Sequence, residues 1–188
     1  MKLIIASNNK HKIYEIKQIL SGKFEEVLSL GEAGISHETV EDGSTFMENA
    51  VKKAREISDI SGCAALADDS GICAHALNGA PGIFSARFSG GTDKDNNALL
   101  LDKLKDKDDR GAHYTCAMAV AFPDGSLVTA EGYMYGTIID DARGEGGFGY
   151  DPIFVPEGDF RTVAELTDKE KNEISHRGRA LLALLEKL

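Results

Sequence analysis

The sequence predicts an α/β fold built on a mixed β-sheet, and two features of the chain lead to this class. Near both ends, apolar runs of strand length alternate with amphipathic segments of helix length. Between them, two strand-like runs enclose Pro123-Asp124-Gly125, a segment that is typical of a hairpin turn. The alternation of strands and helices near the ends predicts parallel strand pairs, and the hairpin in the middle predicts an antiparallel pair. Together they predict a mixed sheet.

The individual elements follow from apolar periodicity and from residues that start or stop regular structure. Strands are expected at residues 2–6, 25–30, 64–67, 72–77, 114–122, 127–136 and 152–155. Helices are expected at residues 10–20, 45–61, 93–104 and 177–188. Ser44 is a suitable N-cap for the second helix, and Gly62 is expected to end it. Glycine-rich or acidic segments at 31–43, 78–91 and 140–149 are expected to be loops.

Length and composition limit the possible functions. With 188 residues, of which 42% are hydrophobic, the chain is expected to form one domain, residues 1–188, with a sizeable core. The net charge of −10 argues against a nucleic-acid-binding surface but not against a nucleotide substrate, for which a few local cations suffice. An odd number of cysteines, three, suggests free thiols, and the sequence shows neither a signal peptide nor a membrane-spanning run. We therefore expect a cytoplasmic protein that binds neither nucleic acid nor membranes.

Two adjacent acidic residues follow the apolar run 64–67. Asp68 and Asp69 stand where this strand is expected to end, and Gly71 is expected to form the turn that stops it. Carboxylates at the C-terminal end of a buried strand point into the crevice where open α/β sheets bind ligands. Because adjacent carboxylates repel each other, a hard cation such as Mg²⁺ would stabilise the pair, and Mg²⁺ usually binds together with a phosphate-bearing substrate. The alternative is a solvated Asp-Ser-Gly turn.

Two helix-associated segments carry groups that suit a phosphate. Residues 7–12, Ser-Asn-Asn-Lys-His-Lys, lie between a strand and a helix, where backbone N–H groups attract anions and Lys12 adds a positive charge. Thr45, Asn49 and Lys53 recur every four residues and therefore share one face of the next helix. Both segments have a structural alternative, namely a capped strand–helix turn and a solvated helix face.

Two later segments could bind a flat heterocycle. Residues 146–152 place aromatic side chains among glycines, which suits a stacking platform for a base or, alternatively, a turn held by core aromatics. The run 171–177 is rich in hydrogen-bond donors that could contact a purine carbonyl, because Lys and Arg only donate; the alternative is a basic surface patch.

Taken in order along the chain, six segments closely resemble the inosine triphosphate pyrophosphatase family, also called the XTP/dITP diphosphatase family. They are SNNKHK at 7–12, TFMENAVKKA at 45–54, DDSG at 68–71, GAPGIFSARFSG at 79–90, GFGYDPIF at 147–154 and EKNEISHRGRA at 170–180. The resemblance implies Mg²⁺-dependent hydrolysis of ITP, dITP and XTP to the monophosphate and pyrophosphate, which removes deaminated purines from the nucleotide pool. It also implies a homodimer and a long mixed sheet flanked by helices, with two lobes and the active-site cleft between them.

The same resemblance implies roles for individual residues. Asp69 is expected to be the general base or the metal-bound activator of water, and Ser70 is expected to contact the substrate. Mg²⁺ is expected to be held by Glu41, Asp68 and Asp69. The triphosphate is expected to be bound by Ser7, Asn8, Asn9, Lys10, His11, Lys12 and Lys53. The nucleoside is expected to be bound by Phe148, Gly149, Tyr150, Asp151, Lys171, His176 and Arg177. Among these, Phe148 would stack on the base, and Lys171, His176 and Arg177 would contact its 6-keto edge.

Two other function classes remain open at this stage. The related Maf-like enzymes cleave other nucleoside triphosphates, including modified pyrimidines. A nucleotide-binding regulator would bind without turnover and would not need a water-activating carboxylate at position 69. Product analysis with ITP, dTTP and ATP separates the three possibilities.

Overall fold

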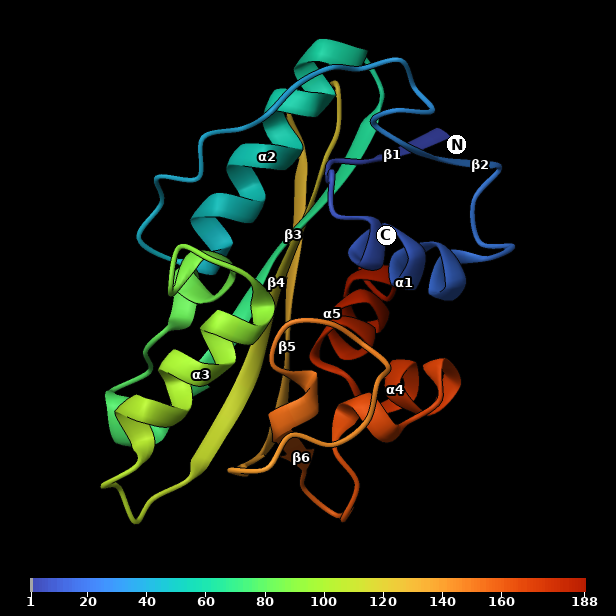
Figure 1. The fold of residues 1–188 in the computed structure, drawn as a ribbon. Helices are drawn as coiled ribbons and strands as arrows, with labels where there is room; N and C mark the ends of the chain where they lie inside the picture. The colour runs from blue at the N-terminus through green and yellow to red at the C-terminus, as the bar shows by residue number, and fades with distance from the viewer. Residues whose placement is uncertain (1) are drawn as a thin grey trace. The chain divides into compact units, whose positions relative to one another are not determined.

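A computed structural model describes residues 2–188 and contains a six-stranded sheet with the strand order β2-β1-β3-β4-β5-β6 (Figure 1). The strands are β1 (Lys2–Ile5), β2 (Glu26–Ser29), β3 (Ala64–Ala74), β4 (Gly111–Ala121), β5 (Leu127–Ile138) and β6 (Phe154–Pro156). Strand β1 is parallel to β2 and β3, whereas β6 is antiparallel to β5. The predicted α/β class with a mixed sheet is therefore confirmed. Met1, the first residue of the predicted domain, lies outside the described residues.

Five α-helices and four short 3₁₀-helices lie within residues 2–188. The α-helices are α1 (Lys10–Leu20), α2 (Phe46–Ser61), α3 (Asp93–Leu104), α4 (Asp168–Ile174) and α5 (His176–Leu185). The 3₁₀-helices are η1 (His75–Leu77), η2 (Gly82–Arg87), η3 (Asp151–Ile153) and η4 (Val163–Glu165). Gly62 ends α2 in the left-handed conformation, with φ 62°, as predicted. The predicted cap at Ser44 is wrong, because Thr45 accepts the N–H of Glu48 instead.

The predicted turn after Asp69 is also wrong, because β3 continues to Ala74. Gly71 lies inside this strand. A Cβ atom there would lie 2.4 Å from both Gly82 O and Ser85 Oγ. A glycine is thus required by the close approach of η2, not by a turn.

Other elements also differ from the prediction. Strand β6 begins two residues late because η3 occupies the expected start. Strand β4 begins at Gly111 rather than at residue 114. Helix α4 was not predicted, although Thr167 and Glu170 form a capping box that marks its start.

The chain divides into two compact units. Unit 1 consists of Met1–Asp69, Cys116–Gly132 and Arg177–Leu188, and unit 2 consists of Ser70–Thr115 and Tyr133–His176. In unit 1 the two faces of the sheet belong to different cores. Leu66 packs in one core with apolar residues of α1 and α5, whereas Ala65 and Ala67 pack in the other with residues of α2. Unit 2 has a core of its own, which includes Ile72 and Leu100.

The cysteines and the helices bear on what the composition suggested. Cys63, Cys73 and Cys116 are free thiols, as predicted. Among the helices of residues 2–188, none combines the length and apolar character that crossing a bilayer requires.

Candidate active site

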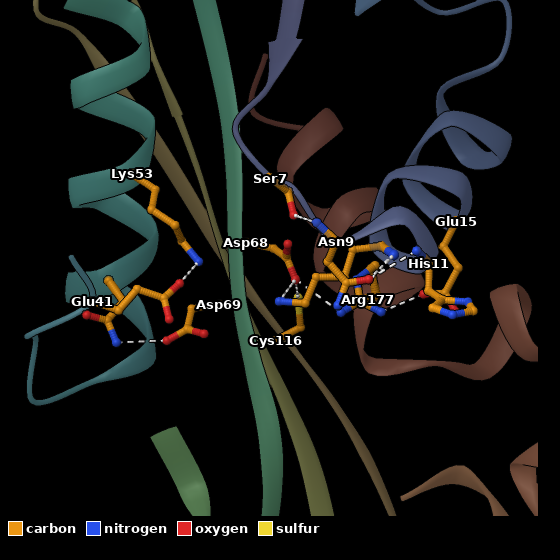
Figure 2. A network of polar contacts seen from close by, with 12 residues as sticks. Ser7, Asn9, His11, Glu15, Glu41, Lys53, Asp68, Asp69, Cys116 and Arg177 are labelled. Carbon is orange, nitrogen blue, oxygen red and sulfur yellow. Dashed lines mark hydrogen bonds and ion pairs between the residues drawn. The ribbon is translucent and has the colours of Figure 1, made fainter. Parts of the chain in front are cut away.

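Asp68 and Asp69 lie in the middle of β3. Successive side chains of a strand point to opposite faces. Asp68 is therefore expected on the same face as Leu66, and Asp69 on the same face as Ala67. Figure 2 shows the result: the two carboxylates point away from each other, to either side of the strand. The two carboxylates therefore do not lie side by side and have different hydrogen-bond and ion-pair partners, although the charges of Lys12 and Lys53 act on both.

On the α2 face, Asp69 is held by a buried amide. Asn49 Nδ2 donates to Asp69 Oδ2 at 2.9 Å, and Asn49 Oδ1 accepts the N–H of Gly43. Burial raises the pKa of the Asp69 carboxyl, although the nearby ammonium groups of Lys53 and Lys12 oppose this effect. A carboxylate with a raised pKa is a stronger proton acceptor than an ordinary surface aspartate.

Lys53 lies one helical turn beyond Asn49 on the same face of α2. Its ammonium group donates to Glu41, which belongs to the loop before this helix (Figure 2). Burial tends to lower the pKa of Lys53, but the charges of Asp68 and Asp69 raise it overall, so Lys53 stays protonated. The helix face predicted from the sequence thus brings an amide and an ammonium group to Asp69.

On the opposite face, Asp68 is surrounded by cations. Lys12 Nζ and Arg177 Nη2 each lie 3.1 Å from Asp68 Oδ2, and the other terminal nitrogen of Arg177 donates to Glu15 (Figure 2). Burial alone would raise the pKa of Asp68, yet the charges of Lys12 and Arg177 outweigh burial and hold it below the usual range. The charges of Lys12 and Arg177 therefore favour the ionised form of this carboxylate.

The segment before α1 forms a capped helix start. Asn9 Oδ1 accepts the N–H groups of His11 and Lys12, and Ser7 Oγ accepts the N–H of Asn9. Asn8, Asn9, Lys10 and His11 are exposed, whereas Lys12 is directed toward Asp68. The structure thus places Lys12 of the predicted phosphate segment next to Asp68.

The predicted nucleoside-binding residues of unit 2 form a second cluster around Asp151. Its Oδ2 accepts from Lys171 Nζ at 2.8 Å and from the N–H of Phe148 at 2.9 Å. The ammonium group of Lys171 also lies 4.7 Å from the centroid of the Phe148 ring. The N–H of Gly149 donates to Asp93 Oδ2 at 2.8 Å, which fixes the glycine-rich turn to the start of α3.

His176 belongs to this second cluster, and Arg177 belongs to unit 1. The His176 ring stacks on Tyr114 in unit 2. Arg177 is 1% exposed and lies with Glu15 and Asp68 in unit 1. Tyr150 donates its hydroxyl to Ser85 O, and Ser70 is half-buried next to Asp69 on β3.

The metal prediction can be compared with the donor groups present. Within residues 2–188, no three His, Cys, Asp or Glu side chains are grouped to hold a metal ion by themselves. Glu41 and Asp69 lie on the same side of β3, both beside Lys53, whereas Asp68 faces the other way (Figure 2). Mg²⁺ is usually bound through one or two carboxylates plus waters and substrate phosphates. Glu41 and Asp69 fit that pattern, whereas the Oδ2 atom of Asp68 is paired with Lys12 and Arg177.

Four residues of these clusters were not assigned a site role from the sequence: Asn49, Glu15, Tyr114 and Asp93. The spacing of Thr45, Asn49 and Lys53 in the sequence places Asn49 on a polar helix face, and this spacing is the signal that points to it. Glu15 and Tyr114 lie in apolar segments, and nothing local distinguishes them from solvated or core positions.

The fold and the clusters define an α/β protein with a carboxylate, amide and lysine centre suited to phosphate chemistry. The comparison with family models is specific: this chain belongs to the Ham1 family, whose model matches residues 3–187.

Several known proteins are similar over nearly the full length. The chain is 48% identical over 197 residues to the dITP/XTP pyrophosphatase of Clostridium perfringens, covering 100% of this chain and 97% of that protein. It is 47% identical over 200 residues to the dITP/XTP pyrophosphatase of Streptomyces coelicolor, covering 98% and 95%. The solved structure of a HAM1 protein from Coxiella burnetii superposes with a TM-score of 0.89 at 38% identity and covers 100% of both chains. These matches confirm the resemblance that the six sequence segments indicated.

Proposed function

We propose that this chain is a nucleoside triphosphate pyrophosphatase that hydrolyses ITP, dITP and XTP to the monophosphate and pyrophosphate. The relatives from Clostridium perfringens and Streptomyces coelicolor support this substrate class by their names. The observation that carries the proposal is the placement of Asp69: a buried carboxylate with a raised pKa, hydrogen-bonded by Asn49 and close to the ammonium group of Lys53.

Hydrolysis requires a water molecule to attack the α-phosphorus while the bond to the β-phosphate oxygen breaks. In our proposal the Asp69 carboxylate takes a proton from this water, and the oxygen of the water forms the new bond to phosphorus. The pyrophosphate leaves with additional negative charge, which the positively charged side chains of Lys53 and Lys12 stabilise. Asn49 keeps the carboxylate of Asp69 oriented during proton transfer.

Magnesium is the cofactor that we propose, and Glu41 and Asp69 are the residues that would hold it. When bound, Mg²⁺ supplies a positive charge that neutralises phosphate oxygens. Asp68 has a different role in this scheme, since it orients Lys12 and Arg177 through ion pairs on the other face of β3.

The cluster around Asp151 supports a role in binding the purine. Phe148 provides a flat ring for stacking, and Lys171 and His176 provide donors for the 6-keto oxygen of hypoxanthine or xanthine. Adenine carries a 6-amino group at that position, which cannot accept from Lys171. A buried polar group left without a partner costs about 1–3 kcal/mol, or roughly one to two decades of discrimination per contact.

Three further properties belong to the same proposal. We expect a homodimer, as the resemblance implies, and a cytoplasmic location, where nucleotide pools and free thiols occur together. Nucleic acid is not an expected partner, because the net charge is −10. Light scattering after size-exclusion chromatography measures the oligomeric state directly.

The decisive experiment is product analysis with ITP, dITP, XTP, ATP and dTTP, each with excess Mg²⁺ and again with EDTA. Pyrophosphate formed preferentially from ITP, dITP and XTP, and abolished by EDTA, supports the proposal. dTTP as the best substrate would favour the Maf-like class, and tight binding without turnover would favour a regulator. The Asp69→Asn variant controls for a contaminating phosphatase.

A further inference from the structure

Tyr114 connects Asp151 and His176, two of the predicted base-binding residues, and has no role in the sequence-based prediction. It lies on β4 in unit 2 and is 6% exposed. Its ring stacks on the ring of His176, with centroids 4.6 Å apart and an interplanar angle of 12°. Its hydroxyl donates to Asp151 Oδ1 at 3.2 Å.

Asp151 in turn fixes the rest of the cluster. While Oδ1 accepts from Tyr114, Oδ2 accepts from Lys171 Nζ and from the backbone N–H of Phe148. Asp151 is 3% exposed, so water does not compete strongly for these bonds. A change in its orientation would therefore move both the ammonium group of Lys171 and the Phe148 segment.

The Tyr114 side chain is itself rigidly held. The Phe154 ring contacts it edge-on, with centroids 4.9 Å apart and an interplanar angle of 75°. Burial, and then the charge of Asp151, raise the pKa of its hydroxyl well above the usual value. The hydroxyl therefore remains a hydrogen-bond donor at any pH at which the protein would work.

We propose that Tyr114 is a positioning residue for purine recognition: its ring sets the plane of His176, and its hydroxyl orients Asp151 and, through it, Lys171 and Phe148. This inference rests on the proposed function, because it assumes that the cluster binds the base. Tyr114 itself contacts no substrate in this scheme, and it acts through the side chains that do.

Two substitutions separate the ring from the hydroxyl. Tyr114→Phe keeps a ring for His176 to stack on but removes the donor to Asp151. Tyr114→Leu removes both. Tyr133→Phe is the matched control, because it removes another tyrosine hydroxyl of unit 2, on strand β5, and Tyr133 has ring contacts with His113 and Tyr135 instead.

Steady-state kinetics with ITP and ATP give the first measurement. We expect Tyr114→Phe to lower the ITP/ATP ratio of kcat/KM about tenfold, the lower end of the value of a hydrogen bond to a charged group, mainly through a higher KM for ITP. Tyr114→Leu should lower it further, and Tyr133→Phe should leave it unchanged. A purely structural role would instead reduce kcat for both nucleotides equally by lowering the amount of folded enzyme. Equal losses, or an unchanged ratio in both Tyr114 variants, would overturn the inference.

A second measurement does not depend on catalysis. IMP has the same base as ITP but lacks the phosphoanhydride bond that the enzyme would cleave. Its binding can therefore be measured by calorimetry whether or not the protein hydrolyses ITP. NMR signals of the His176 ring should shift in Tyr114→Leu, because a stacked aromatic ring displaces them, and should move much less in Tyr114→Phe. Failure of wild-type protein to release pyrophosphate from ITP would refute the proposed function alone. Unchanged His176 signals and unchanged IMP affinity in Tyr114→Leu would refute the positioning role.

Discussion

Asp68 and Asp69 are adjacent in the chain, yet their carboxylates lie on opposite faces of β3 (Figure 2). Asp68 is paired with Lys12 and Arg177, and its pKa is lowered, because these cations outweigh its burial. Asp69 is hydrogen-bonded by Asn49, and burial raises its pKa. The alternation of side chains along the strand thus places the two carboxylates in different surroundings, and it agrees with our proposal that Asp69 is the general base.

Asp69→Asn should abolish most of the activity without affecting the fold. The amide has nearly the same shape as the carboxylate but cannot accept a proton from water. We expect ITP turnover to fall about 10²-fold or more, a typical contribution of a general base. Pyrophosphate release measures the activity, and thermal melting measures the fold.

The neighbouring substitution is a stringent control. Asp68→Asn leaves Lys12 and Arg177 without the charge that they surround, and breaking a buried ion pair typically costs about 3–5 kcal/mol. We therefore expect a clear loss of thermal stability in Asp68→Asn and little loss in Asp69→Asn. Near-normal turnover by Asp69→Asn would show that another group activates the water.

Asn49→Ala should move the acid limb of the pH–rate profile to higher pH. Asn49 donates to the ionised form of Asp69 and thereby lowers its pKa, which burial raises. Without this donor the pKa rises further, so the carboxylate becomes an effective base only at a higher pH. The profile of kcat/KM for ITP, recorded from acid to neutral pH, measures the shift.

Lys52→Ala is the matched control for this shift. Lys52 lies on the same helix, but its ammonium group contacts Asp42 and Val40 O rather than Asp69. Its removal should leave the acid limb in place. An acid limb that moves to lower pH in Asn49→Ala, or does not move, would argue that Asp69 is not the titrating base.

Phe148→Ala should weaken nucleoside binding much more than pyrophosphate binding. Stacking of a base on an aromatic ring contributes about 1–3 kcal/mol, and this contribution is lost with the ring. Inhibition constants for IMP and for pyrophosphate measure the two effects separately. If both constants rise equally, Phe148 supports the fold and does not bind the base.

The sequence predicted most elements because their signals are local. Helix α3 has the predicted bounds, since Thr92 caps it and Leu100 and Leu104 recur at helical spacing. The turn at Gly71 was wrong for the opposite reason. A sequence alone does not distinguish a glycine that ends a strand from a glycine that another segment closely approaches. The close approach to Gly71 is made by Gly82 and Ser85, and it is seen only in the folded chain.

The candidate site was predictable in its composition but not in its pairing. Asp69 and Lys53 were both predicted to be site residues. Helix α2 packs on the face of β3 that carries Ala65 and Ala67, and this packing brings Lys53 near Asp69. The partnership of Arg177 with Glu15 spans 162 residues, and no periodicity links such distant positions. Long-range ion pairs of this kind depend on the completed fold.

Arg177→Lys tests whether Arg177 contacts the base, as the resemblance implies. The guanidinium group is 1% exposed between Glu15 and Asp68, so Arg177→Ala would leave two buried acids without their partner and would destabilise the fold. Lysine keeps the positive charge but not the fork of N–H donors that arginine uses to bind two acceptors.

If Arg177 donates to the 6-keto oxygen, Arg177→Lys should lower the ITP/ATP ratio of kcat/KM roughly 10- to 100-fold. This factor corresponds to the loss of one charged hydrogen bond, about 1.5–3 kcal/mol. Arg179→Lys is the control, because Arg179 lies exposed on the same helix. The ITP/ATP ratio of kcat/KM should not change in this variant. Both ratios are measured at sub-saturating substrate with excess Mg²⁺. An equal loss for ITP and ATP in Arg177→Lys, accompanied by a lower melting temperature, would assign Arg177 to the ion-pair network of Asp68 and Glu15 rather than to base recognition.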